Sequence, residues 1–294
     1  AIGSNPVSVE CWFTAPNVNQ IGFLITKRQP VGPYNQMGII INDGSSPFSP
    51  GAGKKLTFSI FASTSHFRQI TTVNDIVDGA EHHVAAVSDP ITGTLKLYVD
   101  GVLQAVNTGS VGAGFPTIGN TMPYQIGSGN TNVWLYKGEV DEVRIWNTAR
   151  TQAEIQANMN IEPNTSTGLV ASYHFNEGIA DGNNAGITTA TDASGNGNDG
   201  TLNNFALNGS TSNWVAGNAF SAPTVSNDAP ATYPIGNTIV TWTATDASNN
   251  SASATQVVTV VDNEAPVVTC PADITGVIAT SAAGAIVNYT APTG

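Results

Sequence analysis

The chain has 294 residues, and its 9 basic and 21 acidic residues give a formal net charge of −12. Hydrophobic residues make up 40 % and charged residues only 10 %, a composition that supports a folded core rather than disorder. The acidic excess argues against nucleic acid as a partner, and without an apolar run of about 18 residues we expect no membrane insertion.

Short β-strands are the main elements that the sequence predicts. In chain order they span 7–13, 22–26, 37–41, 56–61, 82–88, 95–99, 102–106, 124–126, 139–145 and 170–175. An Asp-Gly pair at 100–101 predicts a type I′ hairpin turn between two of them. One short helix is expected over 151–160, packed across a sheet edge, with Thr148 or Thr151 as its cap and Glu154 closing a capping box. Many short strands, frequent turns and a single helix predict an all-β sandwich.

The composition changes in the last third of the chain. From 219 to 294 the only charges are acidic, and alternating apolar and polar residues predict strands at 237–246 and 254–262. The acidic joint D-N-E-A-P at 262–266 precedes a further strand, because Pro266 holds the residue before it extended. We therefore expect three domains, spanning 1–217, 218–262 and 263–294.

The two cysteines lie far apart in the sequence. No Cys-x-x-Cys pair or Cys/His cluster supports zinc or redox chemistry. Cys11 alternates with apolar neighbours and is expected in the core. Cys270 is expected to be a free thiol or to pair with a residue beyond Gly294.

The loop T-D-A-S-G-N-G-N-D-G-T-L at 191–202 is the strongest candidate for chemistry. Side-chain oxygens at alternate positions of a Gly-rich loop can converge on a hard cation such as Ca²⁺. The predicted metal ligands are Asp192, Ser194, Asn196, Asn198 and Asp199. The alternative is a tight polar turn, because Asn-Gly and Asp-Gly pairs are also strong turn formers.

Asp141 is a further candidate metal ligand. Strand alternation in G-E-V-D-E-V-R-I-W places Asp141 on the same face as Val143 and Ile145, and an inward carboxylate needs a donor, a cation or a metal. Glu142 then shares the other face with Arg144. The alternative is a structural carboxylate that accepts backbone N–H groups from a neighbouring loop.

The segment 122–136 combines aromatic rings with amides, the mixture that sugar sites use. The candidate ligand contacts are Trp134, Tyr136, Asn130 and Asn132. The alternative is that the aromatic rings belong to the core. No nucleophile elbow, P-loop or zinc-protease motif is present, so no catalytic residue is predicted and the chain is not expected to be an enzyme.

Three motifs in order resemble laminin-G-like, concanavalin A-like lectin domains of Bacteroidetes secreted proteins. They are H-H-V-A-A-V-S-D-P-I-T-G-T-L-K-L-Y-V-D-G-V-L at 82–103, G-E-V-D-E-V-R-I-W-N-T-A-R at 138–150 and G-L-V-A-S-Y-H-F-N-E-G at 168–178. The resemblance covers 1–217 and implies a jelly-roll lectin-like sandwich. The family's usual first strand is missing before Ala1, and Glu81 stands where the family usually has Trp.

The segments A-T-Y-P-I-G-N-T-I-V-T-W-T-A-T-D at 231–246 and D-N-E-A-P-V-V-T-C-P-A-D-I-T at 262–275 resemble hyalin repeats. This resemblance implies immunoglobulin-like β-sandwich segments after the lectin-like domain. The first segment holds the later half of a repeat, and the second holds the start of another.

Together these resemblances imply a non-catalytic adhesion or carbohydrate-binding segment of a large secreted or cell-surface bacterial protein. Its partners would be a glycan or a cell-surface ligand, and structural Ca²⁺ would stabilise it. One alternative is a stalk or filament segment completed by neighbouring chains of the same assembly. Another is an accessory binding module of a polysaccharide-degrading enzyme.

Overall fold

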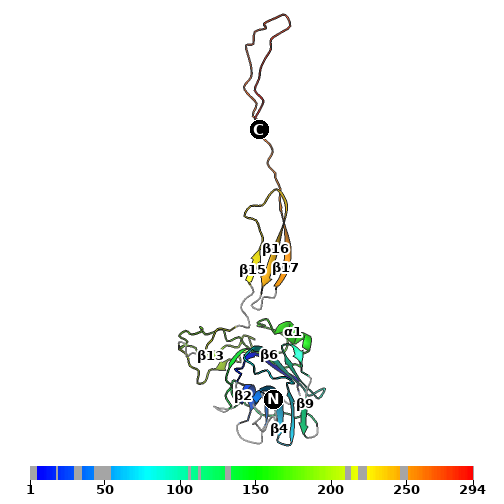
Figure 1. The fold of residues 1–294 in the computed structure, drawn as a ribbon, viewed down its shortest axis with the longest axis vertical. Coiled ribbons are helices and arrows are strands. Elements are labelled where there is room, and N and C mark those ends of the chain that lie inside the picture. Colours follow the sequence, from blue (N-terminus) through cyan, green and yellow to red (C-terminus); the bar gives the residue numbers. More distant parts are fainter. Residues whose placement is uncertain are drawn as a thin grey trace. The chain divides into compact units, whose positions relative to one another are not determined.

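The chain folds into two compact units, Ala1–Ser221 and Ala222–Gly294 (Figure 1). The computed structural model describes all residues except 1–4, 18, 30–34, 43–53, 105–106, 112–113, 130–133, 209–212, 218–223, 246–250 and 294. The three domain boundaries expected from the sequence stay predictions. Among the described residues no helix is long and apolar enough to cross a bilayer.

The first unit is built on two six-stranded antiparallel sheets. The first sheet has the order β12-β11-β1-β6-β7-β8 and the second the order β10-β2-β3-β4-β5-β9. The strands of the first sheet are β1 (Val7–Thr14), β6 (Glu81–Asp89), β7 (Thr94–Val99), β8 (Val102–Leu103), β11 (Glu139–Trp146) and β12 (Leu169–Tyr173). Those of the second are β2 (Gly22–Arg28), β3 (Gln36–Asn42), β4 (Lys55–Ser63), β5 (His66–Thr71), β9 (Asn107–Val111) and β10 (Gln125–Ile126).

Alternate residues of both sheets form one hydrophobic core. Val9, Cys11 and Phe13 enter it from β1, while Met37 and Ile39 enter it from β3. A period of two places every second side chain on this inner face, which explains why strand alternation identified the strands. The predicted all-β, lectin-like jelly-roll sandwich is confirmed, and so is the place of Cys11 in its core.

The hairpin between β7 and β8 turns at Asp100 and Gly101, both of which have a positive φ, of 50° and 70°. This geometry is that of the predicted type I′ turn. Oδ1 of Asp100 also accepts the backbone N–H of His83 at 2.9 Å, and Oδ2 lies 2.8 Å from Nδ1 of His82. The turn residue therefore fastens the start of β6 as well.

The one helix among the described residues, α1 (Gln152–Asn158), begins with the predicted capping box between Thr151 and Glu154. Its buried residue Ile155 packs against Ala85, Val87 and Tyr98. These residues alternate with core residues of β6 and β7, so they lie on the face of the first sheet that points away from the core. The expectation that the helix crosses a sheet edge was wrong, because this outward apolar patch is what α1 buries.

The short pair β13 (Thr189–Ala190) and β14 (Gly200–Thr201) brackets the loop predicted to bind calcium. Ala190 is buried and belongs to the hydrophobic core. The loop is therefore anchored at its base to the sandwich.

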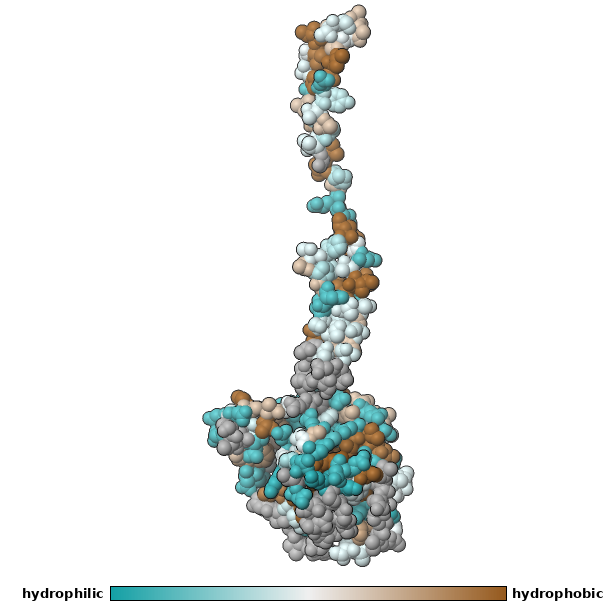
Figure 2. Space-filling view, in the orientation of Figure 1, coloured by the Kyte–Doolittle hydropathy of each residue, from teal (hydrophilic) through white to brown (hydrophobic). Residues whose placement is uncertain are grey.

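The second unit contains a three-stranded antiparallel sheet of β15 (Thr224–Asn227), β16 (Gly236–Thr245) and β17 (Ser251–Val260). The two strands predicted there are confirmed as β16 and β17. Val240 is its one buried hydrophobic residue among those described, and apolar side chains remain at its surface (Figure 2). The immunoglobulin-like fold stays a prediction, and Cys270 is exposed.

Alanine at Gly101 should destabilise the protein more than alanine at Gly93. Both residues have a positive φ, which costs a residue with a Cβ roughly 1–2 kcal/mol. At Gly93 a Cβ would meet open space, whereas at Gly101 it would lie 2.8 Å from Cγ of Gln156 in α1. We expect Gly101→Ala to cost about 1 kcal/mol more than Gly93→Ala in the free energy of unfolding, measured with urea. Equal losses for the two variants would contradict this packing.

Candidate functional site

The face of the second sheet that points away from the core carries buried polar side chains. On β3 and β4 the residues of this outer face are Gln36, Gly38, Ile40, Thr57, Ser59 and Phe61, which alternate with the core residues of the same strands. Gln36 is 0 % exposed and Ser59 is 1 % exposed. Among the described residues, the amide oxygen and nitrogen of Gln36 and the hydroxyl of Ser59 have no hydrogen-bond partner.

Aromatic rings lie on the same outer face. Phe61 of β4 and Phe67 of β5 stack with their centroids 4.6 Å apart and their planes 7° apart. At the other end, a Cβ on Gly38 would come within 2.8 Å of the Phe23 ring and 2.9 Å of the Thr26 hydroxyl. The small residue at position 38 thus lets the phenyl ring of Phe23 lie flat against the sheet.

Burying an amide or a hydroxyl without a partner costs about 1–3 kcal/mol. Gln36 and Ser59 lie on neighbouring strands, because Gly38 pairs with Ser59 in the register of β3 and β4. An amide offers both a donor and an acceptor, and so does a hydroxyl. These two groups therefore have the donor and acceptor chemistry that hydroxyl groups of a ligand match, although the folded chain covers both of them.

The predicted contact Trp134 borders this outer face. The guanidinium of Arg28 lies 4.4 Å from the centroid of the indole ring, and the Phe23 ring lies 6.1 Å from it. Arg28 also donates to the carbonyl of Gly129 at 3.4 Å, which holds the loop beside β2. The structure thus brings Trp134 together with a cation and a second ring, and its role as a ligand contact stays a prediction.

Tyr136 is fastened to the sandwich. Its hydroxyl donates to the carbonyl of Thr14 at 2.8 Å, and its ring packs against the hydrophobic core. Burial raises the pKa of this phenol. This position is the one that the core alternative predicts. Asn130 and Asn132 lie outside the described residues.

Sequence reasoning did not single out Gln36 and Ser59. The only signal was the alternation in Q-M-G-I-I-I-N and K-L-T-F-S-I-F, which places polar and small residues opposite the core. That pattern is equally typical of a face open to water. The burial of these groups comes from the tertiary structure, which the pattern does not contain.

The loop at 192–199 is held by its own hydrogen bonds. Oδ1 of Asp192 accepts the backbone N–H groups of Ser172 and Ser194, each at 3.0 Å, and Oδ2 accepts that of Asn198 at 2.9 Å. Oδ1 of Asp199 accepts the N–H of Asp192 at 2.9 Å. Asp192 therefore joins the loop to β12.

The neutral candidates in this loop are also engaged. The side-chain amides of Asn196 and Asn198 donate to the carbonyl of Val170, and the hydroxyl of Ser194 donates to the same carbonyl. This donor set has the oxygen chemistry that Ca²⁺ prefers, and its carboxylates, hydroxyl and amide N–H groups also hydrogen-bond to the backbone. The geometry is that of the polar-turn alternative, and Ca²⁺ binding here stays a prediction.

Asp141 does not lie on the face that alternation predicts. A β-bulge shifts the register of β1 and β11 between Glu10 and Trp12, and Asp141 pairs with Trp12. Glu142 has a positive φ of 50° at this bulge. The expectation that Asp141 shares a face with Val143 was wrong, because the extra residue breaks the period of two.

The carboxylate of Asp141 accepts the N–H of its neighbour Glu142 at 2.9 Å. Burial, the largest cause, and the charges of Glu142, Glu81 and Glu162 together raise the pKa of Asp141 to about 7 against the lowering effect of that hydrogen bond. The hydrogen bond comes from the adjacent residue of the same strand, whereas the structural alternative placed the donor in a neighbouring loop.

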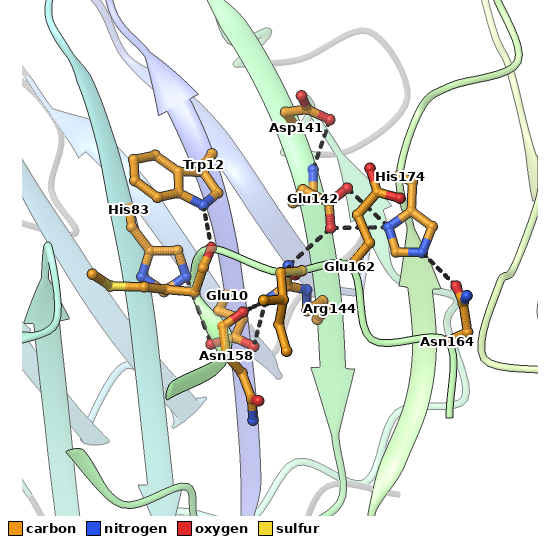
Figure 3. Close-up of polar contacts among 12 residues, drawn as sticks. Glu10, Trp12, His83, Asp141, Glu142, Arg144, Asn158, Glu162, Asn164 and His174 are labelled. Carbon is orange, nitrogen blue, oxygen red and sulfur yellow. Dashed lines mark hydrogen bonds and ion pairs between the residues drawn. The ribbon is translucent and has the colours of Figure 1, made fainter. Parts of the chain in front are cut away.

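A buried polar network lies on the outer side of the first sheet (Figure 3). Arg144 is 0 % exposed, and its guanidinium donates to the carboxylate of Glu142 at 2.9 Å and to the carbonyl of Asn158 at 2.8 Å. It also lies 3.6 Å from Oε1 of Glu10, which accepts the indole N–H of Trp146 at 2.9 Å. The network thus connects β1 and β11 with the C-terminal end of α1.

His83 lies beside this network. Burial, with a smaller contribution from the positive charge of Arg144, lowers the pKa of its imidazole to about 3. Its Nε2 lies 3.6 Å from Oε2 of Glu10, and neither atom makes a hydrogen bond. His83 is therefore neutral at physiological pH and acts as a packing group against the Trp12 ring, 5.4 Å away.

A family model places this architecture among known proteins. Residues 1–156 match Laminin_G_3, described as the concanavalin A-like lectin/glucanases superfamily, and the match covers more than half of the 294 residues. The chain belongs to this superfamily. No curated protein matches it. The hyalin resemblance and an origin in Bacteroidetes stay predictions.

Several solved structures are similar to this chain. A putative carbohydrate binding protein from Bacteroides ovatus has 22 % identity and a TM-score of 0.49, over 71 % of this chain and 56 % of that chain. Domain 4 of AbnA, a GH43 extracellular arabinanase from Geobacillus stearothermophilus in complex with arabinotriose, has 20 % identity and a TM-score of 0.39, over 53 % and 67 %.

The CBM40 of Ruminococcus gnavus IT-sialidase, bound to α2,3 sialyllactose, has 13 % identity and a TM-score of 0.42, over 53 % of this chain and 83 % of that one. The chain spans only 56 % of the length of the Bacteroides ovatus protein. At these identities and TM-scores the likeness carries no information on ligand or activity.

Asp192→Asn should destabilise the protein at neutral pH. Either orientation of the new amide turns an N–H group toward a backbone N–H, so we expect a loss of about 1.5–3 kcal/mol in the free energy of unfolding. Asp181→Asn is the control, because Asp181 also lies in a loop of the first unit but is exposed.

The same variant should lose its effect in acid. Burial of Asp192 opposes ionisation, but hydrogen bonds from Ser194, Ser172 and Asn198 outweigh it and lower the pKa. The stabilisation is therefore complete above the unfolded pKa of about 3.9 and disappears as the pH falls through the lowered pKa of the folded state. Urea unfolding from pH 7 to pH 2 should show the gap between wild type and Asp192→Asn closing, and a constant gap would contradict this role.

Proposed function

We propose that the lectin-like unit binds carbohydrate and performs no catalysis, as part of a secreted or cell-surface protein. The observation that carries the proposal is the buried, unpartnered pair of Gln36 and Ser59 on the outer face of the second sheet. Membership of a superfamily that includes lectins supports the same ligand class. The stacked rings of Phe61 and Phe67 add the apolar surface that sugar C–H groups contact.

The amide of Gln36 and the hydroxyl of Ser59 can donate to and accept from the hydroxyl groups of one sugar ring. Trp134 and Arg28 border the β2 side of this face, so a longer glycan would reach them next. Calcium at 192–199 belongs to a different part of the unit, because that loop is bonded to β12 of the first sheet. In this proposal Ca²⁺ stabilises the loop and does not touch the glycan.

A glycan array, probed with the full chain in Ca²⁺ and in a chelator, tests the proposal. We expect binding to a defined set of glycans in both conditions. Gln36→Met should weaken the best of these interactions at least tenfold, while the free energy of unfolding stays the same or rises, because an unpaired buried amide is removed. Gln104→Met, in the half-exposed segment after β8, is the control that should bind normally.

Two results would contradict this function. One is the absence of glycan binding in both conditions. The other is a Gln36→Met variant that binds as wild type does. If glycan binding is lost only in the chelator, Ca²⁺ is required for binding, and its role is not limited to stabilising the loop at 192–199.

The second unit favours an additional structural role, association with a second copy of the chain. Ile239, Trp242 and Val257 are 64 %, 41 % and 59 % exposed. In the described residues β17 pairs only with β16, and an unpaired edge is a template for another strand.

Sedimentation equilibrium tests this association. We expect the full chain to self-associate more strongly at high salt, because the charges of the second unit are all acidic and repel one another. Val257→Lys should weaken the association. A wild-type chain that stays monomeric at all concentrations and salt levels would exclude this role.

A further inference from the structure

Three side chains that can bind a metal ion converge beside the Arg144 network. Glu142 comes from β11, His174 follows β12, and Glu162 lies in the segment between α1 and β12 (Figure 3). One ligand atom from each lies within 4.8 Å of the other two. Among the described residues this is the one such group of three His, Cys, Asp or Glu side chains.

The imidazole of His174 is oriented as a metal ligand would be. Its Nε2 lies 3.0 Å from the amide oxygen of Asn164, so this nitrogen carries the hydrogen. Its Nδ1 lies 2.8 Å and 2.9 Å from the two carboxylate oxygens of Glu142. When the imidazole is neutral with its hydrogen on Nε2, the lone pair of Nδ1 points toward that carboxylate, and a metal ion can take the place that a proton on Nδ1 would otherwise hold between the two groups.

The charge of the cluster favours a divalent ion in that position. The carboxylates of Glu142 and Glu162 face a single guanidinium, that of Arg144, which donates to Oε2 of Glu142 at 2.9 Å. Oε1 of Glu162 accepts from the amide of Asn176 at 3.1 Å, which turns this exposed side chain toward the cluster.

We propose that Glu142, Glu162 and His174 form a binding site for a divalent transition metal of the Zn²⁺ class. An imidazole nitrogen with two carboxylates suits Zn²⁺, whereas Ca²⁺ takes about six to eight oxygen ligands. The site is separate from the loop at 192–199. It also uses no cysteine, which is why the Cys/His patterns in the sequence gave no sign of it.

The geometry needs only a small adjustment. Tetrahedral Zn²⁺ with bonds of about 2.0–2.1 Å separates its ligand atoms by about 3.3 Å. The gap of 2.8 Å between Nδ1 of His174 and Oε1 of Glu142 would widen by about half an ångström. The exposed carboxylate of Glu162 closes in from the solvent side, and a water molecule takes the fourth position, as in zinc sites with three protein ligands.

A metal here would join three segments that are distant in the sequence. Arg144 already holds the segment around Ile161 through a hydrogen bond to its carbonyl. The metal would bind the next residue, Glu162, to β11 and to the end of β12. Zn²⁺ at a hundredfold excess over its dissociation constant should therefore raise the unfolding midpoint by about 5–10 °C.

The experiment uses the full chain without a histidine tag, stripped of metal with a chelator and titrated with ZnCl₂. Calorimetry and elemental analysis should give one Zn²⁺ per chain, X-ray absorption should show nitrogen and oxygen ligands at about 2.0 Å, and millimolar Ca²⁺ should not compete. Glu162→Gln should weaken binding at least tenfold and abolish the rise in the unfolding midpoint.

Glu162→Gln is the decisive variant because Glu162 is exposed, so the metal-free variant should unfold at the wild-type midpoint. Asp75→Asn makes the same charge change at an exposed position outside the cluster and should bind Zn²⁺ as wild type does. Binding below one equivalent, or equal affinity in Glu162→Gln and wild type, would overturn the proposal and leave a protonated His174 paired with Glu142.

Discussion

Arg144 places a guanidinium where water does not reach it, and the outer side of the first sheet is organised around that charge. The guanidinium binds Glu142, approaches Glu10 and donates to the carbonyl of Asn158 at the end of α1. Removing one partner of such a network leaves the others as uncompensated buried charges, at a cost of about 3–5 kcal/mol. The position of α1 and the course of the chain after it both depend on this residue.

The outer faces of the two sheets differ in how their buried polar groups are covered and paired. The outer side of the first sheet is covered by α1, and the carboxylates there have a guanidinium, an indole N–H and backbone groups as partners. On the second sheet Gln36 and Ser59 are equally buried but lack such partners. Both outer faces keep buried polar atoms without a hydrogen-bond partner among the described residues, such as Oε2 of Glu10 on the first sheet and the amide of Gln36 on the second.

Local signals predicted local structure well. The Asp-Gly pair at 100–101 fixed its hairpin because two positive φ angles suit few other residues, and Thr151 with Glu154 marked the start of α1. The bulge at Glu142 escaped prediction because nothing in D-E-V-R-I-W breaks the alternation. It reverses the face of Asp141, so the candidate ligand at that position was placed on the wrong side.

Sites made of distant segments were beyond the sequence for a related reason. Glu142, Glu162 and His174 come together only because Arg144 holds the segment after α1 against β11. Whether the buried amide of Gln36 finds a hydrogen-bond partner likewise depends on which groups the folded chain brings near it. The spacing of residues in the sequence predicts neither the convergence of these three side chains nor the lack of a partner for Gln36. The polar turn at 192–199 lies within one short segment, so the sequence could offer it as one of two alternatives.

The contact between α1 and the hairpin turn has a consequence for the stability of the helix. The carbonyl of Gly101 accepts hydrogen bonds from the side-chain amides of Gln152 and Gln156. Both turns of this seven-residue helix are therefore bonded to one peptide unit that lies far away in the sequence. A helix this short does not persist alone in water. The helix therefore depends for its stability on this hairpin and on β6 and β7, against which Ile155 packs.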